Sequence, residues 1–421
     1  MQGETILAID PSARWHSIWR STQQIMSRIA ARNRVLYFEP GRDDNRSAVY
    51  EMLRNLPNFL RLPTLREQEN LYVIQTPSGL PYLRRHLPRA VLPLTLPLID
   101  RINSRILLRH VRWAMEALGV RDPILWLLNP GHIDLIGRCG EKLVCYFNYD
   151  EHADFPVNAR IRDFARRRDD ELVRLVDVVF ATSRAQTERR KALNPNTFFI
   201  PNGVDFEEFH RVLDPDLPVP DDIAGIPRPI IGFVGWLGYH IDVRLLIRIA
   251  EAYQDCRLVL VGPEELTKGP DRTRLREMPN VFFLGRKERT ELPNYLKAFD
   301  VALMPWSLEG HVRSAYPLKL HEYLAAGRSS VATALPELFP YRSVISIAET
   351  HEQFIGHIRD ALHDYSPDAI DARVAVARQN TWDHRVDEIS RILGSILTGK
   401  PVQPGRQAGT GKQSSGRRSF Q

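Results

Sequence analysis

The segment RSAYPLKLHEYLAAG, residues 313–327, carries the side chains with the clearest chemical use. It follows the strand-like run DVALMPW, and Pro317 suits the first turn of a helix, where a missing N–H group costs nothing. The free N–H groups of Leu318 and Lys319 would then be available to an anion, which the positive end of a helix favours. Lys319 adds a full positive charge, and Arg313 lies just upstream. The segment therefore predicts a site for phosphate.

Glu322 falls just over one turn into the same predicted helix. A carboxylate repels phosphate, but it can accept hydrogen bonds from a pair of ribose hydroxyls beside the phosphates. Gly327 is placed to end the helix, because glycine tolerates the left-handed backbone that follows a last turn. Taken alone, the segment favours an ordinary amphipathic helix with Leu318, Leu320 (or Tyr323) and Leu324 in the core.

The elements that would position this segment belong to an α/β fold. Short apolar runs rich in Val, Ile, Phe and Tyr alternate with helix-length stretches, such as Trp15 to Ala31. Continuous hydrophobicity indicates strands covered on both faces, and strands separated by helices form parallel sheets. The runs are ETILAID, VLYFEP, LYVIQTP, PILWLLN, KLVCYFNYD and VDVVFATS, and then PIIGFVG, CRLVLVGP, NVFFLG, DVALMPW and SSVATA.

The pattern restarts after a Pro-rich and Asp-rich stretch at residues 213–229, which indicates two domains. We expect Rossmann-like domains over residues 1–205 and 206–398, with a helix over 372–397 that packs back on the first. Their ligands should bind at the carboxyl ends of the strands, in a cleft between the domains. Residues 399–421 lack apolar side chains almost entirely and predict a disordered basic tail.

An ordered series of motifs resembles the group-1 type of glycosyltransferases with the GT-B fold. PNGVDFEEF, residues 201–209, is similar to the interdomain motif of that family, and residues 232–252 are similar to its first donor-domain strand, loop and helix. EYLAAG, at residues 322–327, follows in the expected order. The resemblance implies a sugar-transferring enzyme, of the retaining type, that uses a nucleotide-diphospho-sugar, with Glu322 on the donor ribose and no metal or other cofactor.

The sequence departs from this family at three positions. Ser314 stands where the first carboxylate of an E-x7-E pair is expected, and Trp236 and Ile241 stand where the family has basic residues that steady the diphosphate. Arg313, Lys319 and Arg286 are the available substitutes. A non-catalytic nucleotide-binding homologue therefore stays an alternative.

Three glycines after a strand, Gly232, Gly235 and Gly238, are also compatible with a dinucleotide site. An oxidoreductase that uses NAD(P) would need an acidic residue after the next strand, where Glu264 and Glu265 stand. In the glycosyltransferase reading, Gly235 and Gly238 let the loop approach the donor diphosphate.

The front half should hold the acceptor, and its basic surface fits a glycan or a lipid-linked molecule of a bacterial envelope pathway. His16 follows the first strand, and Asp150 and Glu151 follow another, so these three are the catalytic candidates, although each fits a structural role as well. Residues 80–112 contain seven arginines and one acidic residue among Leu, Ile and Val. This mixture fits a surface that meets anionic lipid and equally a helix with a solvated arginine face. The mixed charges from Arg160 to Leu175 indicate a solvated helix.

Composition sets the remaining expectations. Of the 421 residues 43% are hydrophobic and 26% are charged, which is typical of globular proteins. The three cysteines form no CxxC pair, so we expect neither a disulfide framework nor a zinc site. The amino terminus resembles no signal peptide and no run is long enough to span a membrane, so we expect a cytoplasmic protein, at most peripheral to the inner membrane face, in polysaccharide biosynthesis. We expect no nucleic-acid partner.

Overall fold

The computed structural model describes residues 1–10, 14–16, 19–40, 65–76, 92–149 and 159–402. Within them the chain forms two compact units. The first comprises residues 1–202, 309–316 and 385–400, and the second comprises residues 203–308 and 317–384. The expected domain boundary after residue 205 lies close to the end of the first segment, but the return of residues 309–316 to the first unit was not expected.

The first unit has, in its described part, an eight-stranded sheet of order β3-β4-β2-β1-β5-β6-β7-β8. All neighbours are parallel except β3 and β4. The strands are β1 (Thr5–Ile9), β2 (Arg34–Glu39), β3 (Leu65–Gln68), β4 (Leu71–Gln75), β5 (Ile124–Leu127), β6 (Leu143–Asn148), β7 (Val178–Ala181) and β8 (Thr197–Phe199). Every residue of β5, β6 and β7 is buried, as expected for strands that are covered on both faces.

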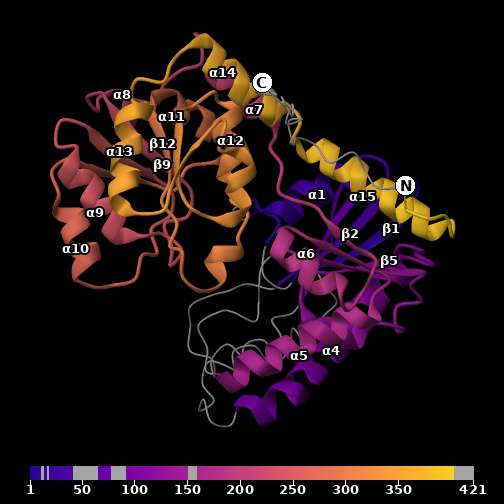
Figure 1. Ribbon diagram of the computed structural model, residues 1–421. Helices are drawn as coiled ribbons and strands as arrows, with labels where there is room; N and C mark the ends of the chain where they lie inside the picture. Colours follow the sequence, from indigo (N-terminus) through magenta and orange to yellow (C-terminus); the bar gives the residue numbers. More distant parts are fainter. Residues whose placement is uncertain (11–13, 17–18, 41–64, 77–91, 150–158, 403–421) are drawn as a thin grey trace, which may run out of the picture. The chain divides into compact units, whose positions relative to one another are not determined.

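Helices cover both faces of this sheet, with α1 and α15 on one side and α4 and α5 on the other (Figure 1). The helices of the unit are α1 (Ser21–Ile29), α4 (Leu92–Ala117), α5 (Ala159–Leu175), α6 (Arg184–Lys191) and most of α15 (Trp382–Leu397), with the short 3-10 turns η2 (Pro130–Leu135) and η6 (Gly310–Ser314). Apolar side chains from α4, α5 and η2 pack with β1, β2, β5 and β6 into one core.

The second unit has a six-stranded sheet in the described residues, parallel throughout, of order β11-β10-β9-β12-β13-β14. Its strands are β9 (Ile230–Val234), β10 (Arg257–Val261), β11 (Val281–Gly285), β12 (Val301–Met304), β13 (Ser330–Thr333) and β14 (Ser346–Ala348). The order reverses between β10 and β12, on either side of β9. That reversal is the place where doubly wound sheets bind ligands, at the carboxyl ends of the strands.

The helices of the second unit also lie on both faces of its sheet, with α9 and α13 in contact on one face and α7, α12 and α14 in contact on the other (Figure 1). They are α7 (Phe206–His210), α8 (Asp221–Ala224), α9 (Val243–Ala252), α10 (Pro270–Glu277), α11 (Leu292–Ala298), α12 (Lys319–Ala325), α13 (His351–Ala361) and α14 (Pro367–Arg378), with 3-10 turns η4 (Arg211–Leu213), η5 (Arg289–Glu291) and η7 (Pro336–Tyr341).

The expected architecture of two Rossmann-like domains, the GT-B fold class, is confirmed. Three differences concern single elements: the predicted helix over 15–31 is shorter, the one over 372–397 is divided between α14 and α15, and β3 is antiparallel. No helix in the described residues is both long and apolar enough to cross a membrane. The predicted tail beyond residue 402 lies outside the described residues.

Candidate functional site

The loop after β9 lies at the reversal point of the second sheet and is held from both sides. On one side, the N–H of Gly235 donates to the carbonyl of Val261 at 2.9 Å, and the N–H of Leu237 donates to Pro263 at 2.9 Å. On the other, the N–H of Ser307 donates to the carbonyl of His240 at 2.8 Å. A loop fixed to the ends of β10 and β12 keeps its side chains in place before any ligand arrives.

Gly235 and Gly238 of this loop lie where space or backbone angle favours glycine. Gly235 has φ of +153°, and its carbonyl oxygen lies so close to Gly262, after β10, that a methyl group on Gly262 would be 1.8 Å away from it. A methyl group on Gly238 would lie 2.6 Å from Cζ2 of Trp236, whose ring folds over it. Close packing thus requires small residues here, and the role of Gly235 and Gly238 toward a diphosphate stays a prediction.

Helix α12 begins at Lys319, later than expected. Leu318 is its N-cap residue, and the carbonyl of Pro317 accepts a hydrogen bond from the N–H of Leu320 at 3.4 Å. Placing Pro317 in the first turn was therefore wrong by two residues. A proline disfavours helical backbone in the residue before it, so helical hydrogen bonding starts only with its own carbonyl.

Helix α12 is attached to β9 and ends in a defined turn. The N–H of Val234, at the end of β9, donates to the hydroxyl of Tyr323 at 3.0 Å, and burial raises the pKa of this hydroxyl above its ordinary value. At the carboxyl end of the helix, Gly327 has φ of +64° and its N–H donates to the carbonyl of Leu324, while the N–H of Arg328 donates to the carbonyl of Tyr323, both at 3.0 Å. These are the two bonds of a Schellman ending, which confirms Gly327 as the end of the helix.

An ion pair stands on the first turn of α12, beside the end of β9. The ammonium of Lys319 donates to Oε2 of Glu322 at 2.6 Å, and both side chains are 16% exposed. Cε of Lys319 would lie 3.4 Å from a methyl group on Gly235, so the lysine passes over this glycine. The pair therefore offers a carboxylate and a positive charge together at the reversal point, still within reach of solvent.

A second charged group lies around Glu208, which the sequence analysis missed. Oε2 of Glu208 lies 2.7 Å from Nη1 of Arg289, and Nη2 of Arg289 donates to Asp205 at 3.4 Å. Burial raises the pKa of Glu208, Arg289 lowers it, and the charges of Asp205 and Glu322 raise it further. Glu208 is thus close enough to Glu322 for the two carboxylates to repel each other. The acidic residues that follow PNGV were the available signal.

The other predicted donor-binding residues are spread over both units. Arg286 is exposed just after β11 in the second unit. Arg313 is exposed and Ser314 is half-buried, and both lie in η6, within a segment that groups with the first unit. Of the predicted set, the structure brings together Gly235, Lys319 and Glu322.

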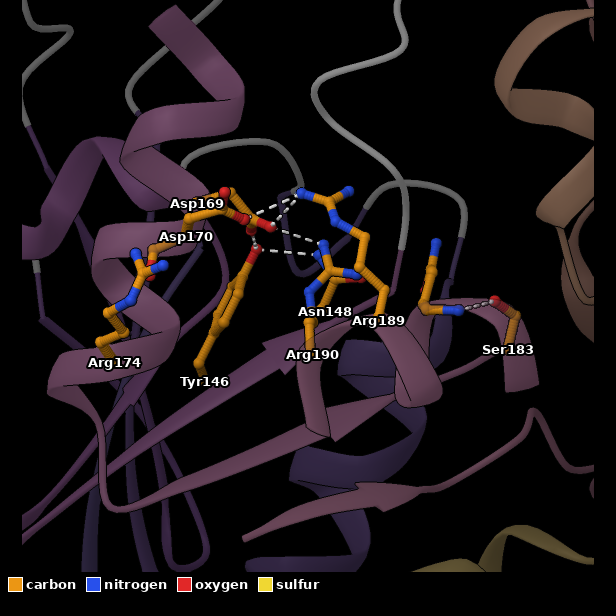
Figure 2. Close-up of polar contacts among 9 residues, drawn as sticks. Tyr146, Asn148, Asp169, Asp170, Arg174, Ser183, Arg189 and Arg190 are labelled. Carbon is orange, nitrogen blue, oxygen red and sulfur yellow. Dashed lines mark hydrogen bonds and ion pairs between the residues drawn. The ribbon is translucent and has the colours of Figure 1, made fainter. Parts of the chain in front are cut away.

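The catalytic candidates of the front half are only partly described. His16 is exposed after β1, and Asp150 and Glu151 lie outside the described residues. Asn148 ends β6 just before them and is fully buried. Its amide donates to the hydroxyl of Tyr146 at 2.8 Å, which in turn donates to Asp169 at 2.7 Å (Figure 2).

Asp169 corrects the expectation that helix α5 is simply solvated. Its carboxylate accepts from Nη2 of Arg190 on α6 at 2.7 Å, and both side chains are buried (Figure 2). The charged residues of α5 were expected to pair along the helix, but Asp169 faces the sheet and binds another helix. Periodicity along one helix gives no sign of a partner 21 residues away.

Glu264, the acidic residue that a dinucleotide site would use, is already bound. Its two carboxylate oxygens accept from Arg272, at 2.6 Å, and from Arg276, and the side chain is 14% exposed. A carboxylate held by two guanidinium groups is poorly placed to accept from a ribose. The geometry therefore disfavours the oxidoreductase reading.

Two doubly wound sheets in one chain, the first parallel except for β3 and the second parallel throughout, are the architecture of the GT-B class. Residues 228–364 match the model of the family described as glycosyl transferases group 1, so the second unit carries a group-1 glycosyltransferase domain. The chain is also 30% identical over 138 residues to TuaH of Bacillus subtilis (strain 168), provisionally named a teichuronic acid biosynthesis glycosyltransferase. This match covers 32% of the chain and 34% of the relative's length.

Solved structures resemble the chain over most of its length. One from E. coli, described as trehalose-6-phosphate bound with UDP-2-fluoro glucose, has a TM-score of 0.66 at 12% identity and covers 95% of this chain and 100% of that one. An alpha,alpha-trehalose-phosphate synthase (UDP-forming) from Burkholderia vietnamiensis has a TM-score of 0.63 at 15% identity, and the match covers 94% of this chain and 100% of that one. At such identities the likeness shows the fold.

Proposed function

We propose that this protein is a glycosyltransferase that moves a sugar from a nucleotide-diphospho-sugar to a glycan or lipid-linked acceptor in bacterial envelope or exopolysaccharide synthesis. The observation that carries the proposal is the Lys319–Glu322 pair over Gly235, at the reversal point of the second sheet. The group-1 match over the same unit and the name of the Bacillus relative support it.

When the donor binds, Lys319 and Glu322 separate, and each contacts a different part of the nucleotide. Glu322 accepts hydrogen bonds from the ribose hydroxyls, and the released Lys319 ammonium turns to the diphosphate. Each charge keeps a partner, so neither is left uncompensated in a half-buried place. Arg286 and Arg313 are the further cations that this proposal assigns to the diphosphate.

The transfer itself relies on electrostatic stabilisation. Negative charge develops on the leaving diphosphate, and a fixed ammonium nearby stabilises it more in the transition state than in the ground state. This step requires no metal or other cofactor. We propose transfer with retention, with the acceptor on the first unit and His16, Asp150 and Glu151 as candidates for contact with the reacting sugar or acceptor.

Peripheral contact with the inner membrane face is a further part of the proposal. Residues 80–91 lie outside the described residues, whereas the rest of the basic segment is helix α4. There Arg101, Arg105, Arg109 and Arg112 are exposed and three or four residues apart, so they share one side of the helix. Each arginine near an anionic bilayer contributes about 1 kcal/mol to the free energy of membrane binding.

Vesicles of phosphatidylglycerol and phosphatidylcholine test this contact by co-sedimentation. The R105E/R109E variant should no longer bind the vesicles, whereas R244E/R248E on α9, two arginines four residues apart whose side chains are 80% and 41% exposed, should bind as the wild type does. Equal binding of both variants would contradict the assignment to α4.

Turnover and affinity test the main proposal. A thermal-shift screen against UDP-, GDP- and dTDP-sugars, the free nucleoside diphosphates and NAD(P)H identifies the class of nucleotide that the protein binds. E322A should then weaken donor binding about 10- to 100-fold, the value of hydrogen bonds to a charged group. E171A removes a comparable i,i+3 pair with Arg168 in the first unit and should leave donor binding unchanged.

Other outcomes of this screen identify the alternatives. Nucleotide binding without release of a nucleoside diphosphate, in the presence of acceptor extracts, would favour a non-catalytic homologue. Stabilisation by NAD(P)H alone would favour an oxidoreductase. Normal turnover and normal donor affinity in E322A would contradict the assigned role of Glu322.

A further inference from the structure

An aromatic cluster lies on the loop that follows β9 and on the end of β12. The ring centroids of Trp236 and Tyr239 are 5.4 Å apart, and those of Trp236 and His240 are 5.3 Å apart. The ring of His240 lies 4.8 Å from that of Trp306. Four aromatic side chains from two loops thus form one continuous group at the carboxyl edge of the second sheet.

This cluster is both rigid and accessible. The backbone of its loop is bonded to the ends of β10 and β12, and Ile241 pairs with Trp306 in an antiparallel bridge. Tyr239 is nevertheless 45% exposed, and Trp236, His240 and Trp306 are only half-buried. Large rings at a fixed, partly exposed place are typical of a surface prepared for a ligand.

Trp306 supplies a polar direction to the same surface. Its indole Nε1 is buried and, within the part of the chain that the structure describes, has no hydrogen-bond partner. A buried N–H without an acceptor is costly, so such groups usually receive one from a ligand or from water. An acceptor oxygen reaches it only when a neighbouring side chain moves aside, so this group adds to the cluster only in a ligand-bound arrangement.

The chemistry of the cluster differs from what the resemblance implies for this loop. Trp236 and Ile241 occupy the two positions where basic residues are expected to steady a diphosphate. Ile241 is 5% exposed and apolar, and Trp236 offers a ring face. These two side chains therefore bring no positive charge to a phosphate, and what the loop offers at Trp236 is aromatic surface.

We infer that Trp236, Tyr239 and Trp306 bind the pyranose ring of a carbohydrate. An aromatic face is electron-rich, and the C–H groups on one face of a pyranose carry slight positive charge, so the two stack favourably. Sugar hydroxyl oxygens are also suitable acceptors for the Trp306 N–H. The inference rests on the proposed function, since both a nucleotide-sugar and a glycan acceptor contain such a ring.

Two binding measurements distinguish the two sources of this ring. Calorimetry compares the affinity for UDP with that for UDP-glucose, and the affinity for GDP with that for GDP-mannose, because each pair differs only by the sugar. Tryptophan fluorescence measures the binding of maltotetraose and cellotetraose. Y239A should lose about 3- to 10-fold in affinity for the sugar-bearing ligand of one arm, the worth of one ring contact, while UDP and GDP bind as before.

Matched variants separate recognition from folding. F339A removes another ring that is 42% exposed in the same unit and should change nothing, and Y239F should restore affinity because the ring face is kept. W306F keeps the ring and removes the N–H group, and it should weaken the same ligand as Y239A. All four proteins should melt within a few degrees of the wild type.

Each outcome bears on a defined statement. A loss confined to nucleotide-sugars assigns the cluster to the donor sugar, and a loss confined to oligosaccharides assigns it to the acceptor. An equal loss for UDP and UDP-glucose would show stacking of the base and overturn the inference, as would unchanged affinity in both arms. A wild type that binds no nucleotide contradicts the proposed function instead, and the oligosaccharide arm then decides the inference alone.

Discussion

Each unit has an ion pair near the carboxyl ends of its strands, and the two pairs differ in burial. Asp169 and Arg190 in the first unit are 3% and 0% exposed (Figure 2). Lys319 and Glu322 in the second unit are each 16% exposed. The first pair also receives a hydrogen bond from Tyr146, whereas the second stands beside a glycine that leaves it open.

This difference separates a structural pair from one that can exchange partners. A fully buried pair cannot release either charge without leaving the other uncompensated, so it holds two helices together. A pair on a helix turn that solvent still reaches contributes less to folding than a fully buried one, and its charges can turn to a ligand. Four substitutions test this contrast, from the largest expected effect to the smallest.

D169A should destabilise the protein by about 3–5 kcal/mol, because it leaves the Arg190 guanidinium buried without its carboxylate. Urea unfolding followed by circular dichroism measures the change. The double variant D169L/R190M removes both charges and should recover most of the loss. A single variant within about 1 kcal/mol of the wild type would show that solvent reaches Arg190.

K319M should weaken the binding of nucleoside diphosphates about 10-fold or more, because it removes a charge-assisted hydrogen bond to phosphate. Its free energy of unfolding should change by less than about 1 kcal/mol, as expected for a pair near the surface. Calorimetry and urea unfolding on one sample measure both. A large loss of stability with intact affinity would reverse the contrast between the two pairs.

G327A should destabilise the second unit by about 1–2 kcal/mol, because φ at this position is +64° and a methyl group would lie 2.9 Å from Ile370. Donor affinity should stay the same, since the site stands at the other end of α12. The control is G356A within α13, where nothing lies within 4 Å and alanine favours the helix. Reduced donor affinity in G327A would show that the helix end also positions the ion pair.

E251Q should change stability by less than about 0.5 kcal/mol. Glu251 pairs with Arg274 on the surface of the second unit, where the side chains are 42% and 65% exposed. This variant gives the baseline for an ion pair without a role in folding or binding. A loss comparable to that of D169A would mean that burial does not separate these pairs.

Patterns within a short stretch of sequence predicted the features that depend only on neighbouring residues. The apolar runs located most strands, and Lys319 and Glu322 were predicted as a pair of functional groups because they share one turn of a helix. Short strands of mixed composition, such as β3 with the sequence LREQ, gave no such signal. They form because a neighbouring strand supplies the hydrogen bonds.

Contacts between distant segments could not be predicted in this way. Asp169 and Arg190 lie on different helices, and His240 and Trp306 on different loops, so only the folded sheet brings each pair together. The position of Trp236 was noted only as a departure from a family pattern. Its meaning depends on the rings around it.

The order in which the chain visits its two units has a consequence for synthesis. Residues 385–400, which include most of α15, group with the first unit, and Ile389, Ile392 and Leu393 of that helix are fully buried. A ribosome makes these residues only after residues 203–308 and 317–384 of the second unit. The first unit therefore has an apolar face uncovered until residues 385–400 have been made, and a fragment that stops at residue 202 should need chaperones or residues 385–400 supplied as a peptide to stay soluble.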